Sequence, residues 1–85
     1  MRPDRLKRRI EAGHVLNIRF TDIVSLVGEL GFALVRVRGS HHIFQHPSVT
    51  ELLNLQQVDG KAKPYQVRQL RRLIGKYNLK LSREQ

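Results

Sequence analysis

The sequence contains no cysteine, and it has only seven acidic residues against 16 lysines and arginines in a chain of 85. The absence of cysteine excludes a disulfide framework, a thiolate zinc site and a cysteine nucleophile. No two acids form a close pair, which disfavours a nuclease that uses two metal ions. No apolar run approaches the roughly 20 residues of a membrane span, and no apolar segment follows the basic start as a secretory signal requires. These absences favour a cytoplasmic protein without a metal or other cofactor.

The excess of basic residues gives a formal net charge of +9 and a pI near 11.2. Such a charge speeds encounters with polyanions and supports non-specific phosphate binding. RNA, DNA and an acidic partner protein are therefore all open as partners. An anionic membrane is not favoured, because no segment joins a strong apolar face to a basic face at interfacial length.

Apolar periodicity predicts one small α+β domain. The expected elements are a short helix at 2–12, a linker at 14–20, a core helix at 22–30, strands at 32–38, 41–46 and 51–56, a polar loop at 57–63, a basic helix at 64–77 and a frayed polar tail at 80–85. Thr21 is the expected N-cap of the core helix. Hairpin-length connections predict a three-stranded antiparallel sheet with both main helices on one face.

The most distinctive stretch is the expected hairpin turn at Gly39-Ser40. Arg36 and Arg38 come just before this turn, and His41 and His42 follow it directly. Histidine can exchange a proton near neutral pH, and arginines can stabilise a charged phosphate. The pattern therefore suits acid–base chemistry on an anionic substrate. The alternative is that His41 only caps the hairpin and fills space.

His42 and His46 lie two positions from Phe44 on either side, so all three share one face of a strand. This spacing can place two histidines near a metal ion. The sequence offers no cysteine as a further ligand, and Glu51 is the only carboxylate nearby. The ligand set is therefore incomplete, and a metal site is not expected. A partly buried, hydrogen-bonded histidine next to Pro47 is the preferred interpretation.

The last helix and the segment that leads into it are basic. The residues concerned are Lys61, Lys63, Arg68, Arg71 and Arg72. They can follow RNA phosphates, receive an acidic protein surface, or form an ordinary solvated face. The few aromatic residues are interpreted as core or helix-start residues and not as a platform for stacking bases.

Two segments resemble the HicA toxin family, also called the YcfA-type family. They are Gly31-Phe32 through Arg38-Gly39-Ser40-His41-His42-Ile43-Phe44-Gln45-His46-Pro47, and Gly60-Lys61-Ala62-Lys63-Pro64 leading into the basic helix that ends near Tyr77-Asn78-Leu79. The resemblance divides the single domain 1–85 into a HicA-like core at 20–80, a basic N-terminal extension at 1–19 and a tail at 81–85.

The resemblance implies a fold like the double-stranded-RNA-binding domain, α-β-β-β-α, here with a short additional N-terminal helix. It implies a toxin of a type II toxin–antitoxin system that cleaves messenger RNA and is neutralised by a HicB-like antitoxin. The family's histidine carries over onto His41, with His42 a close second. Many members also have a proline and a histidine around the third strand. This chain reads Asn54-Leu55-Gln56-Gln57 there, so any role of that histidine is missing or falls to another residue.

The sequence thus predicts a metal-independent endoribonuclease, an mRNA interferase that uses a histidine as general acid or base. Arg36, Arg38 and Ser40, together with the basic residues of the last helix, are the expected RNA-binding residues. The alternative is a non-catalytic RNA-binding module on the same fold. A DNA-binding accessory protein is a third interpretation, supported by charge alone.

Overall fold

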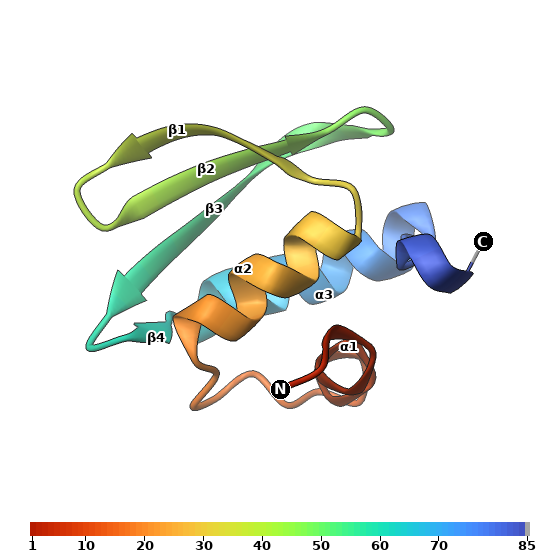
Figure 1. Ribbon diagram of the computed structural model, residues 1–85, viewed down its shortest axis with the longest axis horizontal. Coiled ribbons are helices and arrows are strands. Elements are labelled where there is room, and N and C mark those ends of the chain that lie inside the picture. The colour runs from red at the N-terminus through yellow and green to blue at the C-terminus, as the bar shows by residue number, and fades with distance from the viewer. Residues whose placement is uncertain (85) are drawn as a thin grey trace.

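The computed structural model describes residues 1–84, and its elements follow the predicted order (Figure 1). They are α1 (Pro3–Glu11), α2 (Phe20–Glu29), β1 (Ala33–Arg38), β2 (His41–His46), β3 (Val49–Val58), β4 (Lys61–Ala62), α3 (Pro64–Tyr77) and a 3₁₀ turn at Ser82–Glu84. The strands form one antiparallel sheet in the order β1-β2-β3-β4. This is the predicted α+β fold with a short N-terminal helix, and it is consistent with the double-stranded-RNA-binding-domain type.

The elements form layers. Helices α2 and α3 lie on one face of the sheet, and α1 packs on the side of these helices away from the strands (Figure 1). Leu6 and Ile10 of α1 join the same buried cluster as Leu53 and Leu55 of β3. The other face of the sheet is uncovered by helices among residues 1–84. The hydrophobic core therefore lies between the sheet and α1, with α2 and α3 at its centre.

Strand β1 confirms the strand predicted at 32–38, but all six of its residues are exposed. It is an edge strand, whereas α3 packs on β3, α2 contacts β4, and Phe20 of α2 meets His42 of β2. Val35 and Val37 alternate with Arg36 and Arg38 as in a half-buried strand, but the packing that normally rewards this pattern is absent. The sequence pattern therefore identified the strand and not its exposure.

Helix α2 begins at Phe20, two residues before the predicted start, so the expected N-cap at Thr21 is wrong. The N-cap is Arg19, and no side chain caps the helix there. Instead the Phe20 N–H donates to the Gly60 carbonyl oxygen at 2.9 Å, and the Phe20 ring is buried. The turn at Gly60 is distant in sequence, so local capping rules could not identify it.

The predicted loop at 57–63 contains the end of β3, a tight turn and the short strand β4. Asp59 and Gly60 both have positive φ angles, of 52° and 76°. This conformation matches the two-residue hairpin turn for which Asp-Gly is favoured. The hairpin continues β3 beyond the predicted end at residue 56, because β4 gives its last residues a pairing partner. The third strand also begins earlier than predicted, at Val49, which is buried.

The C-terminal tail is not a frayed polar segment throughout, which corrects the prediction for 80–85. Asn78 ends α3 in the left-handed conformation, and the chain then buries Leu79 and Leu81 in the core. Leu81 is only 4% exposed. Two leucines separated by a lysine give too short a pattern to indicate burial from sequence.

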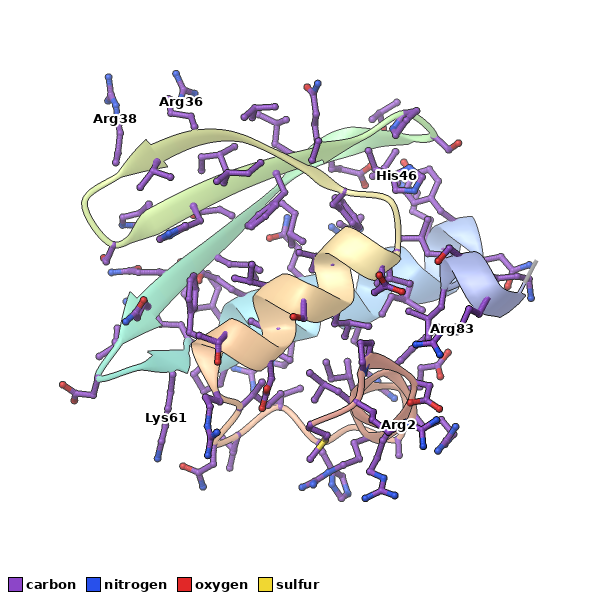
Figure 2. All side chains as sticks on the ribbon, viewed as in Figure 1. Arg2, Arg36, Arg38, His46, Lys61 and Arg83 are labelled. Carbon is purple, nitrogen blue, oxygen red and sulfur yellow. The ribbon has the colours of Figure 1, made fainter. Side chains whose placement is uncertain are left out.

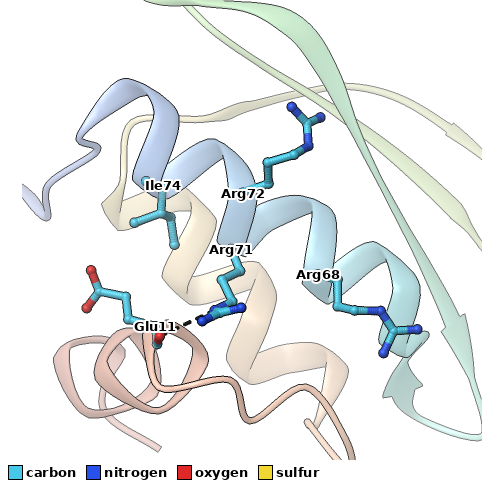
Figure 3. Close-up of a pocket in the computed structure, with 6 residues that line it drawn as sticks. Glu11, Arg68, Arg71, Arg72 and Ile74 are labelled. Atoms are coloured by element: carbon cyan, nitrogen blue, oxygen red, sulfur yellow. Dashed lines mark hydrogen bonds between the residues drawn. The ribbon is translucent and has the colours of Figure 1, made fainter.

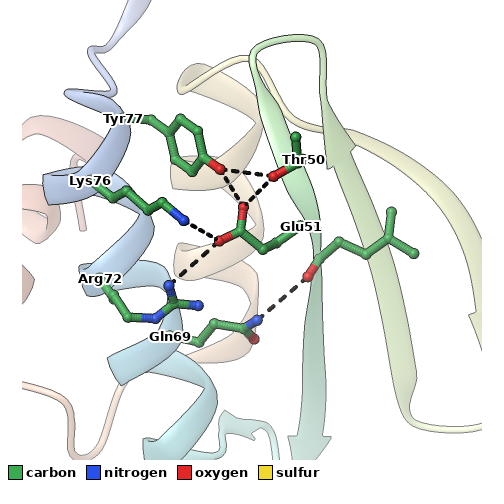
Figure 4. Close-up of polar contacts among 7 residues, drawn as sticks. Thr50, Glu51, Gln69, Arg72, Lys76 and Tyr77 are labelled. Carbon is green, nitrogen blue, oxygen red and sulfur yellow. Dashed lines mark hydrogen bonds and ion pairs between the residues drawn. The ribbon is translucent and has the colours of Figure 1, made fainter.

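Glu51 on β3 forms the main polar connection between the sheet and the end of α3 (Figure 4). Its carboxylate accepts hydrogen bonds from Tyr77 Oη at 2.5 Å and from Lys76 Nζ at 3.1 Å, and it pairs with Arg72 at 3.5 Å. The Tyr77 hydroxyl, followed by Lys76, lowers the pKa of Glu51 to about 2. Glu51 is therefore ionised and structurally engaged, so it is a poor metal ligand or general acid.

Within the part of the chain that the structure describes, none of the helices is both long and apolar enough to span a membrane.

Candidate active site and nucleic-acid interface

The β1–β2 turn brings the predicted catalytic and phosphate-binding residues to one end of the sheet. Gly39 has a φ of 56°, a conformation in which glycine is the least strained residue. Across the turn, Arg38 pairs with His41 and Val37 pairs with His42. The Ser40 carbonyl oxygen accepts the N–H of Gln57 at 3.0 Å, which fixes the turn to β3.

His42 points toward the helices. Its ring meets the Phe20 ring of α2 edge to face, with the centroids 4.8 Å apart. Its Nδ1 lies 3.3 Å from the Ser40 carbonyl oxygen, which can only accept a hydrogen bond. This contact favours the tautomer with the proton on Nδ1, and it leaves the Nε2 lone pair free to take a proton.

His41 points to the opposite, helix-free face, since successive side chains of a strand alternate. Its Nδ1 lies 3.3 Å from the Asn54 oxygen and 3.2 Å from the Asn54 nitrogen, so this partner fits either ring tautomer. Figure 2 shows Arg36 and Arg38 extending from β1 away from the helices. Within residues 1–84 neither arginine has a hydrogen bond or an ion pair, so both guanidinium groups are free for a ligand. Because His41 and His42 lie on opposite faces of β2, the two histidines cannot act side by side on one phosphate.

His46 has a structural role, as predicted for a partly buried, hydrogen-bonded histidine next to Pro47. Its Nε2 lies 2.9 Å from the Leu30 carbonyl oxygen at the end of α2, and its Nδ1 accepts the Ser48 N–H at 3.0 Å. Its ring packs against Phe32, with centroids 5.1 Å apart (Figure 2 labels its position). Among residues 1–84 no group of three histidines or acids could hold a metal ion.

Lys61 and Lys63 lie where the two main helices begin. Residue 61 pairs with Arg19, and the Ala62 N–H donates to the Ile18 carbonyl oxygen at 3.0 Å, so the starts of α2 and α3 lie side by side. Lys61 reaches Asn17 Oδ1 at 3.3 Å, and Lys63 Nζ lies 5.9 Å from the Tyr65 ring centroid. In Figure 2, Lys61 extends on the opposite side of the molecule from Arg36 and Arg38. Lys61 and Lys63 therefore form a group separate from Arg36 and Arg38.

The three predicted arginines of α3 line a depression beside α1 (Figure 3). Arg71 donates to the Glu11 carbonyl oxygen at 3.3 Å, and Arg72 pairs with Glu51. Both are thus engaged in holding α3 to α1 and β3. Arg68 has no such partner within residues 1–84 and is the freest of the three for RNA.

Sequence reasoning did not assign Tyr65 and Gln66 to the site. Tyr65 is 57% exposed, whereas Phe20, Phe32 and Phe44 are buried. Gln66 is 1% exposed and accepts the Gln56 N–H through Oε1. The sequence carries only a weak signal for this pair, a tyrosine directly after the proline that opens a basic helix.

A family model described as the HicA toxin of bacterial toxin-antitoxin matches residues 20–76. This range runs from the first residue of α2 almost to the end of α3, and it includes the whole sheet. The comparisons with curated proteins and with solved structures found no match.

Proposed function

Because the chain belongs to the HicA toxin family of bacterial toxin–antitoxin systems, we propose that it is a metal-independent endoribonuclease that cleaves messenger RNA in the cytoplasm. A histidine of the Gly39–His42 turn is its general acid or base, and a HicB-like antitoxin holds it inactive by covering that turn. The observation that carries this proposal is the hairpin turn, which is followed directly by two partly exposed histidines and has the unpaired Arg36 and Arg38 on the same face as His41.

The chemistry needs no metal ion. A histidine nitrogen removes the proton from a 2′-hydroxyl, and the resulting oxygen attacks the adjacent phosphorus. The bond from phosphorus to the 5′-oxygen then breaks, that oxygen takes up a proton from water, and the histidine returns its own proton to the solvent. The products carry a 2′,3′-cyclic phosphate and a 5′-hydroxyl. One positioned histidine contributes typically about 10²- to 10⁴-fold to such a reaction, and cationic side chains stabilise the charge on the phosphorane.

The hydrogen bonds favour His42 as the base, which reverses the order suggested by the family resemblance alone. The Ser40 carbonyl oxygen favours the proton on Nδ1 of His42, so its Nε2 is ready to accept another proton. The Asn54 side chain gives His41 no comparable preference. His41 instead lies opposite Arg38, where it suits binding of a phosphate.

The N-terminal segment 1–19 belongs to the same working unit in this proposal, since Leu6 and Ile10 of α1 lie in the common core.

The rival function is a non-catalytic RNA-binding module. It shares the basic surface and the net charge of +9, and it predicts the same salt-sensitive RNA binding. Only the ribonuclease predicts histidine-dependent cleavage.

The test is induced expression of the wild type, His41→Ala, His42→Ala and His14→Ala, with growth and messenger RNA integrity followed together. His14 is exposed and lies in the linker before α2, so His14→Ala is the matched control and should arrest growth like the wild type. We expect His42→Ala to leave growth and RNA intact while the purified variant melts as a folded protein. Loss of activity in His41→Ala alone would assign the base to His41. If the wild type neither arrests growth nor degrades RNA, the binding module replaces the ribonuclease.

A further inference from the structure

Tyr65 differs from the other four aromatic residues. Three phenylalanines lie in the core, and Tyr77 is half-buried with its hydroxyl bonded to Glu51. Tyr65 alone keeps its ring mainly in solvent. The Tyr65 hydroxyl accepts a hydrogen bond from the buried Gln66, but packing in the core does not account for the exposed ring.

The surroundings of Tyr65 suit a nucleotide. Lys63 Nζ lies 5.9 Å from the centroid of its ring, and Lys61 follows the adjacent hairpin turn. Beside these lysines is a shallow depression whose apolar lining includes Leu16, Val58 and Pro64. Single-stranded nucleic acid is held by this combination of an aromatic ring for the base and cations for the backbone.

A hydrogen-bonded connection fixes Tyr65 relative to the histidine hairpin. Gln66 Nε2 donates to Tyr65 Oη at 3.3 Å, and Gln66 Oε1 accepts the N–H of Gln56. Gln56 pairs with His41 across the sheet. Its carbonyl oxygen also accepts the Lys63 N–H at 3.3 Å on the other side. Two interstrand steps of about 4.8 Å each separate His41 from Lys63, or roughly 10 Å in all.

We propose that Tyr65 stacks on one unpaired base of the RNA substrate, while Lys61 and Lys63 contact the neighbouring phosphates. Gln66 is the positioning residue that holds the ring. The proposal rests on the proposed function and adds to it the substrate class, single-stranded RNA, and a contact that can favour some bases over others. A duplex cannot use this contact, since its bases are stacked on each other. The lysines also suit an acidic protein segment, but such a segment would not require an aromatic ring.

The test measures binding of a short fluorescent single-stranded RNA whose 2′-hydroxyls are methylated, so that the wild-type chain cannot cleave it. Fluorescence anisotropy compares the wild type with Tyr65→Ala, Tyr65→Leu and Tyr65→Phe. Stacking on one base is worth about 1–3 kcal/mol, so Tyr65→Ala should weaken binding roughly tenfold. Tyr65→Leu keeps apolar bulk without the π face and should also bind weakly. Tyr65→Phe keeps the π face but loses the hydrogen bond from Gln66, so it should bind more weakly than the wild type and more tightly than Tyr65→Ala.

Two controls isolate the stacking contact. The same RNA annealed to its complement should bind the wild type and Tyr65→Ala equally, because only the phosphates are available. Leu34→Ala, an exposed apolar residue on β1, should not change binding to the single strand. Thermal melting checks that each variant folds, which an exposed ring at position 65 should permit.

Equal binding of the single strand by folded Tyr65→Ala and the wild type would overturn the proposal. So would an equal loss for the single strand and the duplex, since that would indicate an electrostatic or structural effect. The outcome is separable from that of the expression test. Tyr65-dependent binding without any RNA cleavage would retain the stacking site and reject the ribonuclease, whereas cleavage with Tyr65-independent binding would do the reverse.

Discussion

Replacing Gly31 tests whether the His46 ring needs a residue without a side chain at position 31 to reach the Leu30 carbonyl oxygen. Gly31 follows α2 with a φ of 100°, and a Cβ built on it would lie 2.8 Å from His46 Nε2. A methyl group there has two costs: the backbone strain of a left-handed residue and the displacement of the His46 ring. Displacement breaks the contact of Nε2 with the Leu30 carbonyl oxygen, which is 2.9 Å long.

Gly13 provides a matched control with the same backbone strain and no clash. Its φ is 101°, and nothing lies within 4 Å of a Cβ built on it. We expect Gly13→Ala to lower the free energy of unfolding by about 1–2 kcal/mol from strain alone. Gly31→Ala should lose this amount and the hydrogen bond, worth roughly 0.5–1.5 kcal/mol more. A difference of about 1 kcal/mol corresponds to roughly 4–8 °C in Tm for a domain of this size.

The assay is urea and thermal unfolding of Gly13→Ala, Gly31→Ala, His46→Ala and the double variant Gly31→Ala/His46→Ala. His46→Ala removes the ring with which the new methyl group collides. The double variant should therefore be more stable than the sum of the two single effects predicts, by about 1 kcal/mol. Two results would refute the predicted clash with His46. One is an equal loss of unfolding free energy in Gly31→Ala and Gly13→Ala, and the other is single effects that add to within about 0.3–0.5 kcal/mol in the double variant.

Two further predictions concern β3 and the tail. The pKa of Glu51 is about 2 in the folded chain, against an ordinary value of 4.5. The carboxylate therefore stabilises the fold above about pH 4.5, and this contribution is lost as the pH falls toward about 2. Melting curves should show Glu51→Gln less stable than the wild type at neutral pH and the two converging in acid; a gap independent of pH would contradict this. Leu81→Ala should cost about 2–5 kcal/mol in denaturant unfolding, as expected for a buried leucine. Its exposed counterpart Leu34→Ala should change the stability by less than about 0.5 kcal/mol, and equal effects would show that the tail does not belong to the core.

The fold was largely predictable, because most of its elements carry their own local signals. Helical spacing of apolar residues identified all three helices, and the Gly39-Ser40 turn fixed the central hairpin. The errors fall where distant contacts decide. Helix α2 starts at Phe20 because of the turn at Gly60, and β3 extends to Val58 because β4 pairs with it. Leu81 is buried in the same cluster as residues of α1 and α3, which are distant in sequence, so no local pattern indicates its burial.

The candidate site was predictable in composition but not in arrangement. The hairpin histidines and the basic residues could be selected from the sequence, because chemistry on phosphate uses these types of side chain. The period of two placed His41 and His42 on opposite faces, but it could not tell which face the helices cover. In the structure, the Phe20 ring of α2, 22 positions before His42, meets the histidine edge to face, so the helices cover the face of His42.

The arginines of α3 show why a count of basic residues does not define an RNA-binding surface. By charge alone Arg68, Arg71 and Arg72 are equivalent. In the fold, Arg71 holds the end of α1 and Arg72 pairs with Glu51, while Arg68 has neither partner. A guanidinium group that already has a protein partner must lose it before it binds phosphate, so its contribution to RNA affinity is reduced by that loss. The effective cationic surface is therefore smaller than the net charge of +9 suggests. Of the predicted residues, it comprises the free Arg36 and Arg38 of β1, Arg68 of α3, and the lysines beside Tyr65.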